Sequence, residues 1–192
     1  MVHEILVWPH PTLKQKAKPV EVVDDATRQL IKDLFESMYA ADGVGLAAPQ
    51  IGVLRTVIVL DTTPRQPESK AVAMITPEIL TLDGKTIYKE GCLSVPGEAE
   101  DVERALTVTV RYLDEQGVQR TLDADGLLAI AVQHETDHLK GVMFVDHIST
   151  LKRELIRKRM KKVQSARADE RPDQPEARAA SRKKEGARAG AL

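Results

Sequence analysis

The chain has 192 residues and a single cysteine, which suits one self-supporting domain without an internal disulfide. It shows neither a basic leader nor a run of roughly 18 apolar residues, so we expect a cytoplasmic protein without a membrane span. The net charge of −1 hides an asymmetry: residues 1–150 carry 14 Lys+Arg and 23 Asp+Glu, whereas residues 151–192 carry 14 and 6.

The first half of the chain predicts a helix followed by short strands. Residues 24–41 start with the capping residues Asp24 and Asp25 and place apolar side chains at helical spacing. That face comprises Leu30, Ile31, Leu34, Phe35, Met38 and Tyr39. Gly43-Val44-Gly45 then predicts a tight loop. Strands are expected at 55–60, 71–75, 79–82 and 86–88, with a polar loop over 62–70.

The second half predicts a hairpin and two helices. Residues 105–113 alternate apolar and polar, and a turn at 114–117 leads to a partner strand at 118–122. Residues 127–140 are apolar nearly all round in their first two turns, which predicts a buried helix ending near Gly141. A last helix starts near Ser149. Its expected apolar stripe is Leu151, Leu155, Ile156 and Met160.

The pattern as a whole predicts an α+β fold, with antiparallel or mixed β-sheets around a central buried helix and helices at both ends. Beyond about residue 164 the chain has almost no large apolar side chain and cannot offset the entropy cost of ordering. We therefore expect a catalytic domain over 1–163, with an amphipathic helix at 151–163, and a basic disordered tail over 164–192.

The strongest chemical signal is His134-Glu135-Thr136-Asp137-His138. Residues i and i+4 of a helix share a face, so both imidazoles can bind one metal ion, and Glu135 can contact a water on it. The plainer interpretation is two histidines facing the core beside an incidental glutamate. Buried helices rarely hold acidic residues without a polar partner, which favours the metal site.

A catalytic metal site usually has three protein ligands and one open position. Two residues are candidates for the third ligand: His147, downstream of the helix, and Cys92 in Glu90-Gly91-Cys92-Leu93-Ser94-Val95-Pro96. A free cysteine is more often a small buried apolar residue. The nearby glycine and proline indicate a shaped loop, which favours a ligand. Spacing alone leaves both candidates open.

A third segment, Gly43-Val44-Gly45-Leu46-Ala47-Ala48-Pro49-Gln50, is no phosphate loop, because the Lys-Ser/Thr that would follow is missing. The Gln50 amide could donate a hydrogen bond to a developing negative charge. Taken alone, this residue is more often an ordinary surface glutamine.

Together the three segments resemble the peptide deformylase family, whose motifs read G-x-G-L-A-A-x-Q, E-G-C-L-S and H-E-x-D-H. All fixed positions match, in the same order, and the layout agrees over residues 4–160. The resemblance implies removal of the formyl group from N-terminal formyl-methionine of new polypeptides, with release of formate. The Val95-Pro96 continuation is similar to the type found in many Gram-negative bacteria.

The resemblance also implies roles for individual residues. Cys92, His134 and His138 would bind the metal, and Glu135 would act as general base and then as general acid. The Gln50 amide and the Leu93 backbone N–H would stabilise the oxyanion. Gly45 would contact the substrate through its backbone.

The methionine side chain of the substrate needs an apolar pocket beside the metal. Ile130 and Ala131 precede His134 by one helical turn and Leu127 by two, so all three share its face. With Val44 they are the candidates for this pocket, although ordinary core packing is the plainer interpretation, above all for Leu127.

Two arguments about the metal differ. One thiolate and two imidazoles suggest Zn²⁺ by donor type. The family resemblance implies Fe²⁺, with Zn²⁺, Ni²⁺ or Co²⁺ able to substitute, and we follow the resemblance. Family members often carry an aromatic or basic residue soon after the cysteine motif, whereas this chain has Gly97-Glu98-Ala99-Glu100-Asp101. We therefore expect a weaker preference at later substrate positions.

The partners expected are formyl-methionyl nascent peptides. The basic last helix could also dock on ribosomal RNA phosphates near the exit tunnel, although a solvated helix packed on the body is the plainer interpretation. We expect a monomer. The alternatives are an endopeptidase with its third ligand after His138, a non-catalytic binding protein that keeps the fold, and an amidase for another formylated amine.

Overall fold

The computed structural model describes residues 1–64, 66 and 70–170, which fold as an α+β structure. Its helices are α1 (Asp25–Ala40), α2 (Gly126–Leu139) and α3 (Thr150–Glu170), with short 3₁₀ turns η1 (Pro11–Lys14), η2 (Ala48–Ile51) and η3 (Phe144–Asp146). Its strands are β1 (Gly45–Ala47), β2 (Val57–Leu60), β3 (Val72–Asp83), β4 (Thr86–Cys92), β5 (Val95–Arg104), β6 (Thr107–Leu113) and β7 (Gln119–Asp125).

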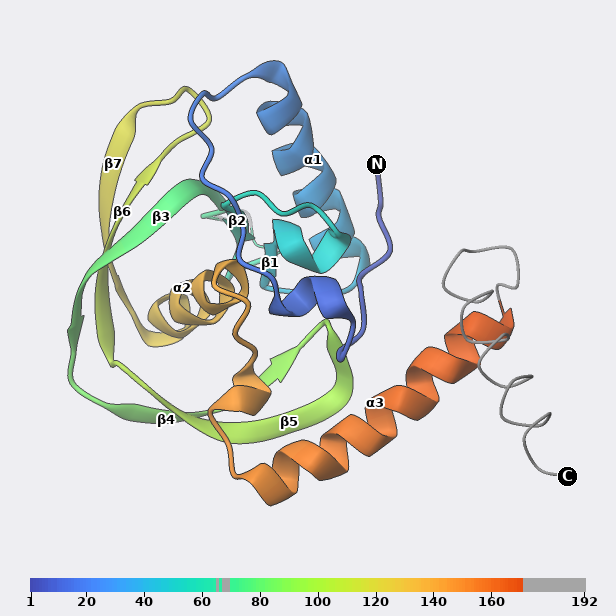
Figure 1. The fold of residues 1–192 in the computed structure, drawn as a ribbon. Coiled ribbons are helices and arrows are strands. Elements are labelled where there is room, and N and C mark those ends of the chain that lie inside the picture. The colour runs from blue at the N-terminus through green and yellow to red at the C-terminus, as the bar shows by residue number, and fades with distance from the viewer. Residues whose placement is uncertain (65, 67–69, 171–192) are drawn as a thin grey trace, which may run out of the picture.

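The strands form two antiparallel sheets that curve around α2 (Figure 1). Five strands pair in the order β1-β2-β3-β6-β7, and β4 pairs with β5. The register between β3 and β6 shifts twice, between Ile75 and Glu78 and between Ile79 and Thr81. Such irregularities bend a strand and increase its twist, so the sheet can wrap around the helix.

Strand β2 is buried on both faces, which explains its unbroken apolar sequence. Val57 and Val59 pack with the apolar side of α1, whereas Ile58 and Leu60 pack in the cluster that contains α2. Helix α2 therefore lies in the interior, as its sequence predicted, and α1 covers the outer face of β1 and β2. The predicted α+β class with a central buried helix is confirmed.

Several predicted elements agree with the structure. Helix α1 begins after Asp24, whose carboxylate accepts a hydrogen bond from the Thr27 N–H at 2.7 Å. The hairpin of β6 and β7 forms as predicted, and the chain reverses after α2 at Gly141, which has a φ of 73°.

The region around Cys92 differs from the prediction. The expected strands at 71–75 and 79–82 are one long strand, β3, and the segment after Cys92 is strand β5 rather than a shaped loop. Cys92 itself ends β4 and pairs with Val95. Strand β5 was missed because four of its ten residues are acidic and few are apolar, and its pairing with β4 is a tertiary contact that the local pattern does not contain.

Helix α3 packs through a narrower face than predicted. Ile156 and Met160 are buried against Val102 and Phe144, but Leu151 and Leu155 are 73% and 46% exposed, so these two assignments were wrong. The helix also continues to Glu170, past the boundary expected at 163. The remainder of the predicted tail, 171–192, lies outside the described residues.

None of the helices in the described ranges has the length and apolar character needed to cross a bilayer.

The packing of α3 predicts different costs for two apolar residues. Ile156→Ala should lower the free energy of unfolding by about 2–5 kcal/mol because it leaves a cavity under the helix. Leu151→Ala, the matched control, should change it by less than about 0.5 kcal/mol because the side chain is already in water. Urea unfolding of both variants measures the difference, and equal losses would contradict this packing.

Candidate metal centre and active site

Strand β4 and helix α2 bring three metal-ligating side chains together. The His134 Nε2 lies 3.2 Å from the His138 Nε2, which lies 3.3 Å from the Cys92 Sγ. One donor atom of each residue lies within 4.8 Å of the other two, and both imidazoles are buried. Ligands bound to one ion at about 2.0–2.3 Å leave gaps of this size between their donor atoms. The three residues therefore fit one metal ion.

The two histidines have opposite pKa shifts. Burial lowers the pKa of His138 well below its usual value, and the neighbouring His134 lowers it further, so this ring is neutral. The His134 Nδ1 lies 2.8 Å from the Glu90 Oε2. Because a carboxylate accepts, that nitrogen carries the hydrogen. Burial lowers the pKa of His134, but the contacts with Cys92 and Glu90 outweigh it and raise this pKa well above its usual value, so a metal would displace the proton on its Nε2.

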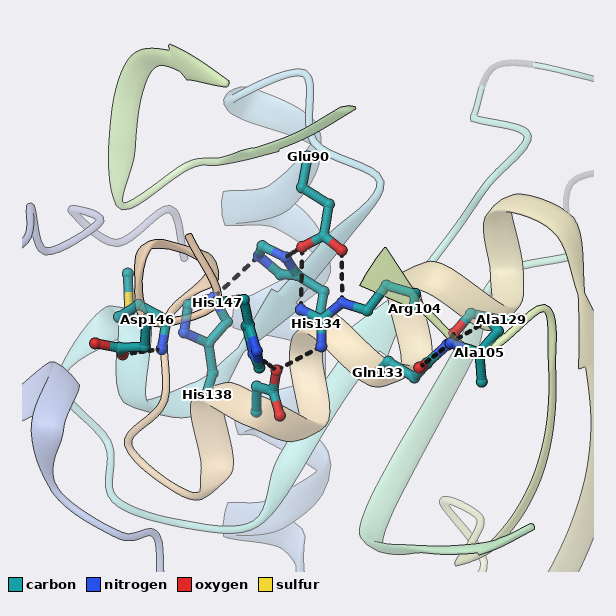
Figure 2. Close-up of polar contacts among 11 residues, drawn as sticks. Glu90, Arg104, Ala105, Ala129, Gln133, His134, His138, Asp146 and His147 are labelled. Carbon is teal, nitrogen blue, oxygen red and sulfur yellow. Dashed lines mark hydrogen bonds and ion pairs between the residues drawn. The ribbon is translucent and has the colours of Figure 1, made fainter. Parts of the chain in front are cut away.

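His147, the other candidate for a third ligand, lies elsewhere. Its Nε2 is 2.8 Å from the Asp137 Oδ2, the oxygen that also accepts a hydrogen bond from the Arg104 Nη1 at 2.7 Å (Figure 2). Within the described ranges, Cys92, His134 and His138 are the only residues grouped closely enough to hold a metal. The geometry therefore favours Cys92 over His147.

A buried ion pair stands behind the His134 ring. The Arg104 guanidinium binds the Glu90 carboxylate through two hydrogen bonds of 2.6 and 3.1 Å, as Figure 2 shows. Burial alone would raise the pKa of Glu90, but the hydrogen bonds from His134 and Arg104 outweigh it and lower this pKa to about 2. Glu90 thus stays charged and fixes the orientation of His134.

Glu135 lies in the pocket wall with an unsatisfied carboxylate. Its Oε2 is buried without a hydrogen-bond partner, and burial raises its pKa to about 7. A carboxylate with a pKa near neutral can both take and give a proton at physiological pH. That property suits the acid–base role predicted for it.

The Gln50 amide has a fixed orientation. Its Oε1 accepts a hydrogen bond from the Ala47 N–H at 2.8 Å, so its Nε2 points to the Ser94 Oγ at 3.2 Å and the Cys92 Sγ at 3.6 Å. Gln50 is buried in η2, so the interpretation as a surface glutamine was wrong. Leu93 and Ser94 form the turn between β4 and β5, which places the Leu93 backbone beside the same centre.

One open pocket of about 1250 Å³ connects nearly all predicted site residues. Its lining includes Val44, Gly45, Gln50, Cys92, Leu93, Leu127, Ile130, Ala131, His134 and Glu135. His138 is almost fully buried and does not line the pocket. The apolar end of the pocket is formed by Ile130 and Ala131, both buried, and by the partly exposed Leu127.

Three contributors were missed by the sequence reasoning. Glu90 and Ser94 belong to the cysteine motif but had been given no role, although their places on either side of Cys92 were a usable signal. Arg104 could not be found locally, because its partners lie 14 and 33 residues away.

Gly45 has a steric role besides the expected backbone contact. A Cβ at this position would lie 2.5 Å from the Glu135 Oε1. The glycine therefore leaves the space that the Glu135 carboxylate occupies. At Gly43 a Cβ would lie 2.7 Å from the Leu93 Cδ1. The loop therefore passes close both to helix α2 and to the turn after β4.

Comparisons with known proteins agree on one family. The polypeptide deformylase family model matches residues 2–154. A peptide deformylase from Phenylobacterium zucineum is 52% identical over 162 residues, which cover 84% of this chain and 96% of that protein. A peptide deformylase structure from Legionella pneumophila has 43% identity and a TM-score of 0.82, and the match covers 88% of this chain and 98% of that one.

A Met-Ala-Ser-bound class I type b peptide deformylase from Acinetobacter baumannii is also similar. It has 38% identity and a TM-score of 0.71, and the match covers 77% of this chain and 99% of that one.

The contact at Gly45 predicts a selective defect. Gly45→Ala should displace the Glu135 carboxylate and lower kcat by about 10²–10⁴-fold, the usual contribution of a general acid–base group. Metal content should stay at one ion per chain, because no ligand moves. Formate release from a formylated peptide and metal analysis test this together, and loss of the metal in the variant would contradict it.

Proposed function

The chain belongs to the polypeptide deformylase family and removes the formyl group from the N-terminal formyl-methionine of new polypeptides, and we propose that this reaction takes place at Cys92, His134 and His138. The observation that carries the proposal is the pocket lined by Cys92 and His134, which joins the proposed metal site to a buried carboxylate, an oriented amide and an apolar end. Formate and a free N-terminal methionine are the products.

Each group has a proposed part in the hydrolysis. Cys92, His134 and His138 would hold a divalent ion, which would supply Lewis-acid chemistry and lower the pKa of the attacking water. Glu135 accepts the proton of the attacking water and passes it to the leaving amine. The Gln50 Nε2 and the Leu93 N–H donate to the carbonyl oxygen as it gains charge.

Substrate orientation follows from the two ends of the pocket. We assign the methionine side chain to the apolar end formed by Leu127, Ile130 and Ala131, with Val44 at its edge. The Gly45 backbone lies on the edge strand β1, which has a neighbour on one side only, so an extended peptide can add to it. The Acinetobacter baumannii relative bound to Met-Ala-Ser supports this class of substrate.

We assign Fe²⁺ as the ion, one per chain, with Zn²⁺, Ni²⁺ or Co²⁺ able to substitute. The thiolate and two imidazoles accept any of these metals. A cytoplasmic monomer is proposed with it, since a single ligating thiol suits a reducing compartment. An endopeptidase with its third ligand after His138 is less favoured, because His147 contacts Asp137 instead.

The first test is formate release from formyl-Met-Ala-Ser by protein purified without oxygen in the presence of Fe²⁺. Glu135→Ala should lower kcat by about 10²–10⁴-fold with the metal retained. Cys92→Ala should lose both metal and turnover. Glu21→Ala, an exposed glutamate, is the matched control and should behave as wild type. Absence of turnover in metal-loaded wild type would favour a peptidase, another amidase or a binding protein.

We also propose that α3 docks the enzyme on ribosomal RNA. Several of its cations are already engaged, since Lys152 and Arg159 bind Glu100 and Glu98 of β5. Lys158, Lys161 and Lys162 are exposed, share one helical face, and have no ion-pair partner in the part of the chain that is described. This face offers three positive charges to phosphate groups.

Reversing the charge of that face should weaken ribosome binding. Lys158→Glu, Lys161→Glu and Lys162→Glu together should reduce co-sedimentation with ribosomes. The slope of the logarithm of the binding constant against the logarithm of the salt concentration should become shallower by about one for each lysine. The control reverses Lys16, Lys32 and Lys70, three exposed lysines elsewhere, and changes the net charge equally. Equal losses in the two triple variants would reduce the effect to net charge and refute a docking face.

A further inference from the structure

The pocket extends well beyond the metal ligands and the apolar end. From the Gly43–Gly45 loop it continues along the end of α1 to residues 2–5, and its lining includes Glu98 of β5 and Arg167 of α3. Its volume of about 1250 Å³ exceeds the roughly 300–1,000 Å³ typical of a small-molecule site. The outer part can therefore hold peptide residues that follow the formyl-methionine.

Helix α3 removes the negative charge that the sequence places on this outer part. The Arg159 guanidinium binds the Glu98 carboxylate through two hydrogen bonds of 2.5 and 2.7 Å. Lys152 binds Glu100 in the same way at 2.6 Å. Glu98 and Glu100 are thus directed to α3 and neutralised by it, and Asp101 does not line the pocket, so the acidic stretch does not make the groove acidic.

Arg167 adds a positive charge to the same groove. Its Nη1 donates to the Ile5 carbonyl at 3.2 Å, and one helical turn earlier the Gln164 Nε2 donates to the Val7 carbonyl at 2.6 Å. These two contacts tether the end of α3 to the N-terminal segment. The Arg167 Nη1 also lies 4.0 Å from the Glu4 Oε1, a long ion pair at the surface. A guanidinium has five N–H donors and the side chain remains 41% exposed, so donors are left for a ligand.

We propose that Arg167 is a specificity-determining residue that binds the substrate beyond its second residue and favours a carboxylate side chain there. Arg159 acts as a positioning residue, because it keeps Glu98 away from the same part of the peptide. The weak preference expected from residues 97–101 alone did not take α3 into account. The proposal rests on the deformylase function assigned above and names a further part of its substrate site.

The test compares peptides of different length and charge. The substrates are formyl-Met-Ala, formyl-Met-Ala-Asp-Asp and formyl-Met-Ala-Lys-Lys, assayed with wild type, Arg167→Gln and Arg167→Glu at low and high salt. Arg167→Gln removes the charge but keeps a donor for the Ile5 carbonyl. Arg157→Gln is the matched control, because Arg157 is exposed on the same helix and pairs with Glu154 outside the groove.

Wild type should prefer the Asp-Asp over the Lys-Lys peptide at low salt. Arg167→Gln should lower kcat/KM for the Asp-Asp peptide about two- to fivefold, the range for one exposed ion pair, through KM rather than kcat. Arg167→Glu should reverse the preference. Arg157→Gln should match wild type throughout, and the preference should shrink at high salt.

Turnover of formyl-Met-Ala by wild type tests the deformylase function separately from the role of Arg167, because this short substrate does not reach the outer groove. If that turnover is present and all variants show the same ratio between the Asp-Asp and Lys-Lys peptides, the role of Arg167 is overturned. An equal decrease in kcat/KM for the Asp-Asp peptide in Arg157→Gln and Arg167→Gln would also overturn this role. The effect would then come from the charge of the helix as a whole.

Discussion

The buried ion pair between Glu90 and Arg104 joins the two halves of the site. Glu90 lies on β4, two residues before the proposed metal ligand Cys92, and Arg104 ends β5 and reaches across to Asp137 on α2. Removing both charges from water costs several kcal/mol per ion, which only a well-formed bidentate contact offsets. The same carboxylate accepts a hydrogen bond from the His134 ring. Glu90 therefore both joins the β4–β5 hairpin to helix α2 and orients His134 toward Cys92 and His138.

Space is the second constraint on the site, and two glycines satisfy it. Gly45 leaves room for the Glu135 carboxylate, and Gly43 leaves room for the Leu93 side chain. The loop before β1 can therefore approach both α2 and the turn after β4. This close approach keeps the carboxylate away from water, and the raised pKa of Glu135 is the electrostatic result.

The parts of the site that the sequence predicted are those encoded over short distances. His134 and His138 share a face because helical spacing alone puts them there. Cys92 could be placed only by the family resemblance, since its proximity to α2 depends on a contact 46 residues away. Strand β5 and the true face of α3 were missed for a related reason. The charges of β5 are paired with those of α3, and each element read alone resembles a solvated surface.

That pairing gives the C-terminal helix a second role beside its proposed ribosome contact. One side of α3 neutralises Glu98 and Glu100 and brings Arg167 to the groove, while Lys158, Lys161 and Lys162 lie on exposed parts of the helix. Without the first set of contacts, an acidic groove mouth would have to approach RNA phosphates, and like charges raise the free energy of such an approach. The acidic β4–β5 hairpin and the basic helix α3 therefore depend on each other. Helix α3 neutralises the charge of the hairpin, and the hairpin holds α3 in a position where its three exposed lysines can face a polyanion.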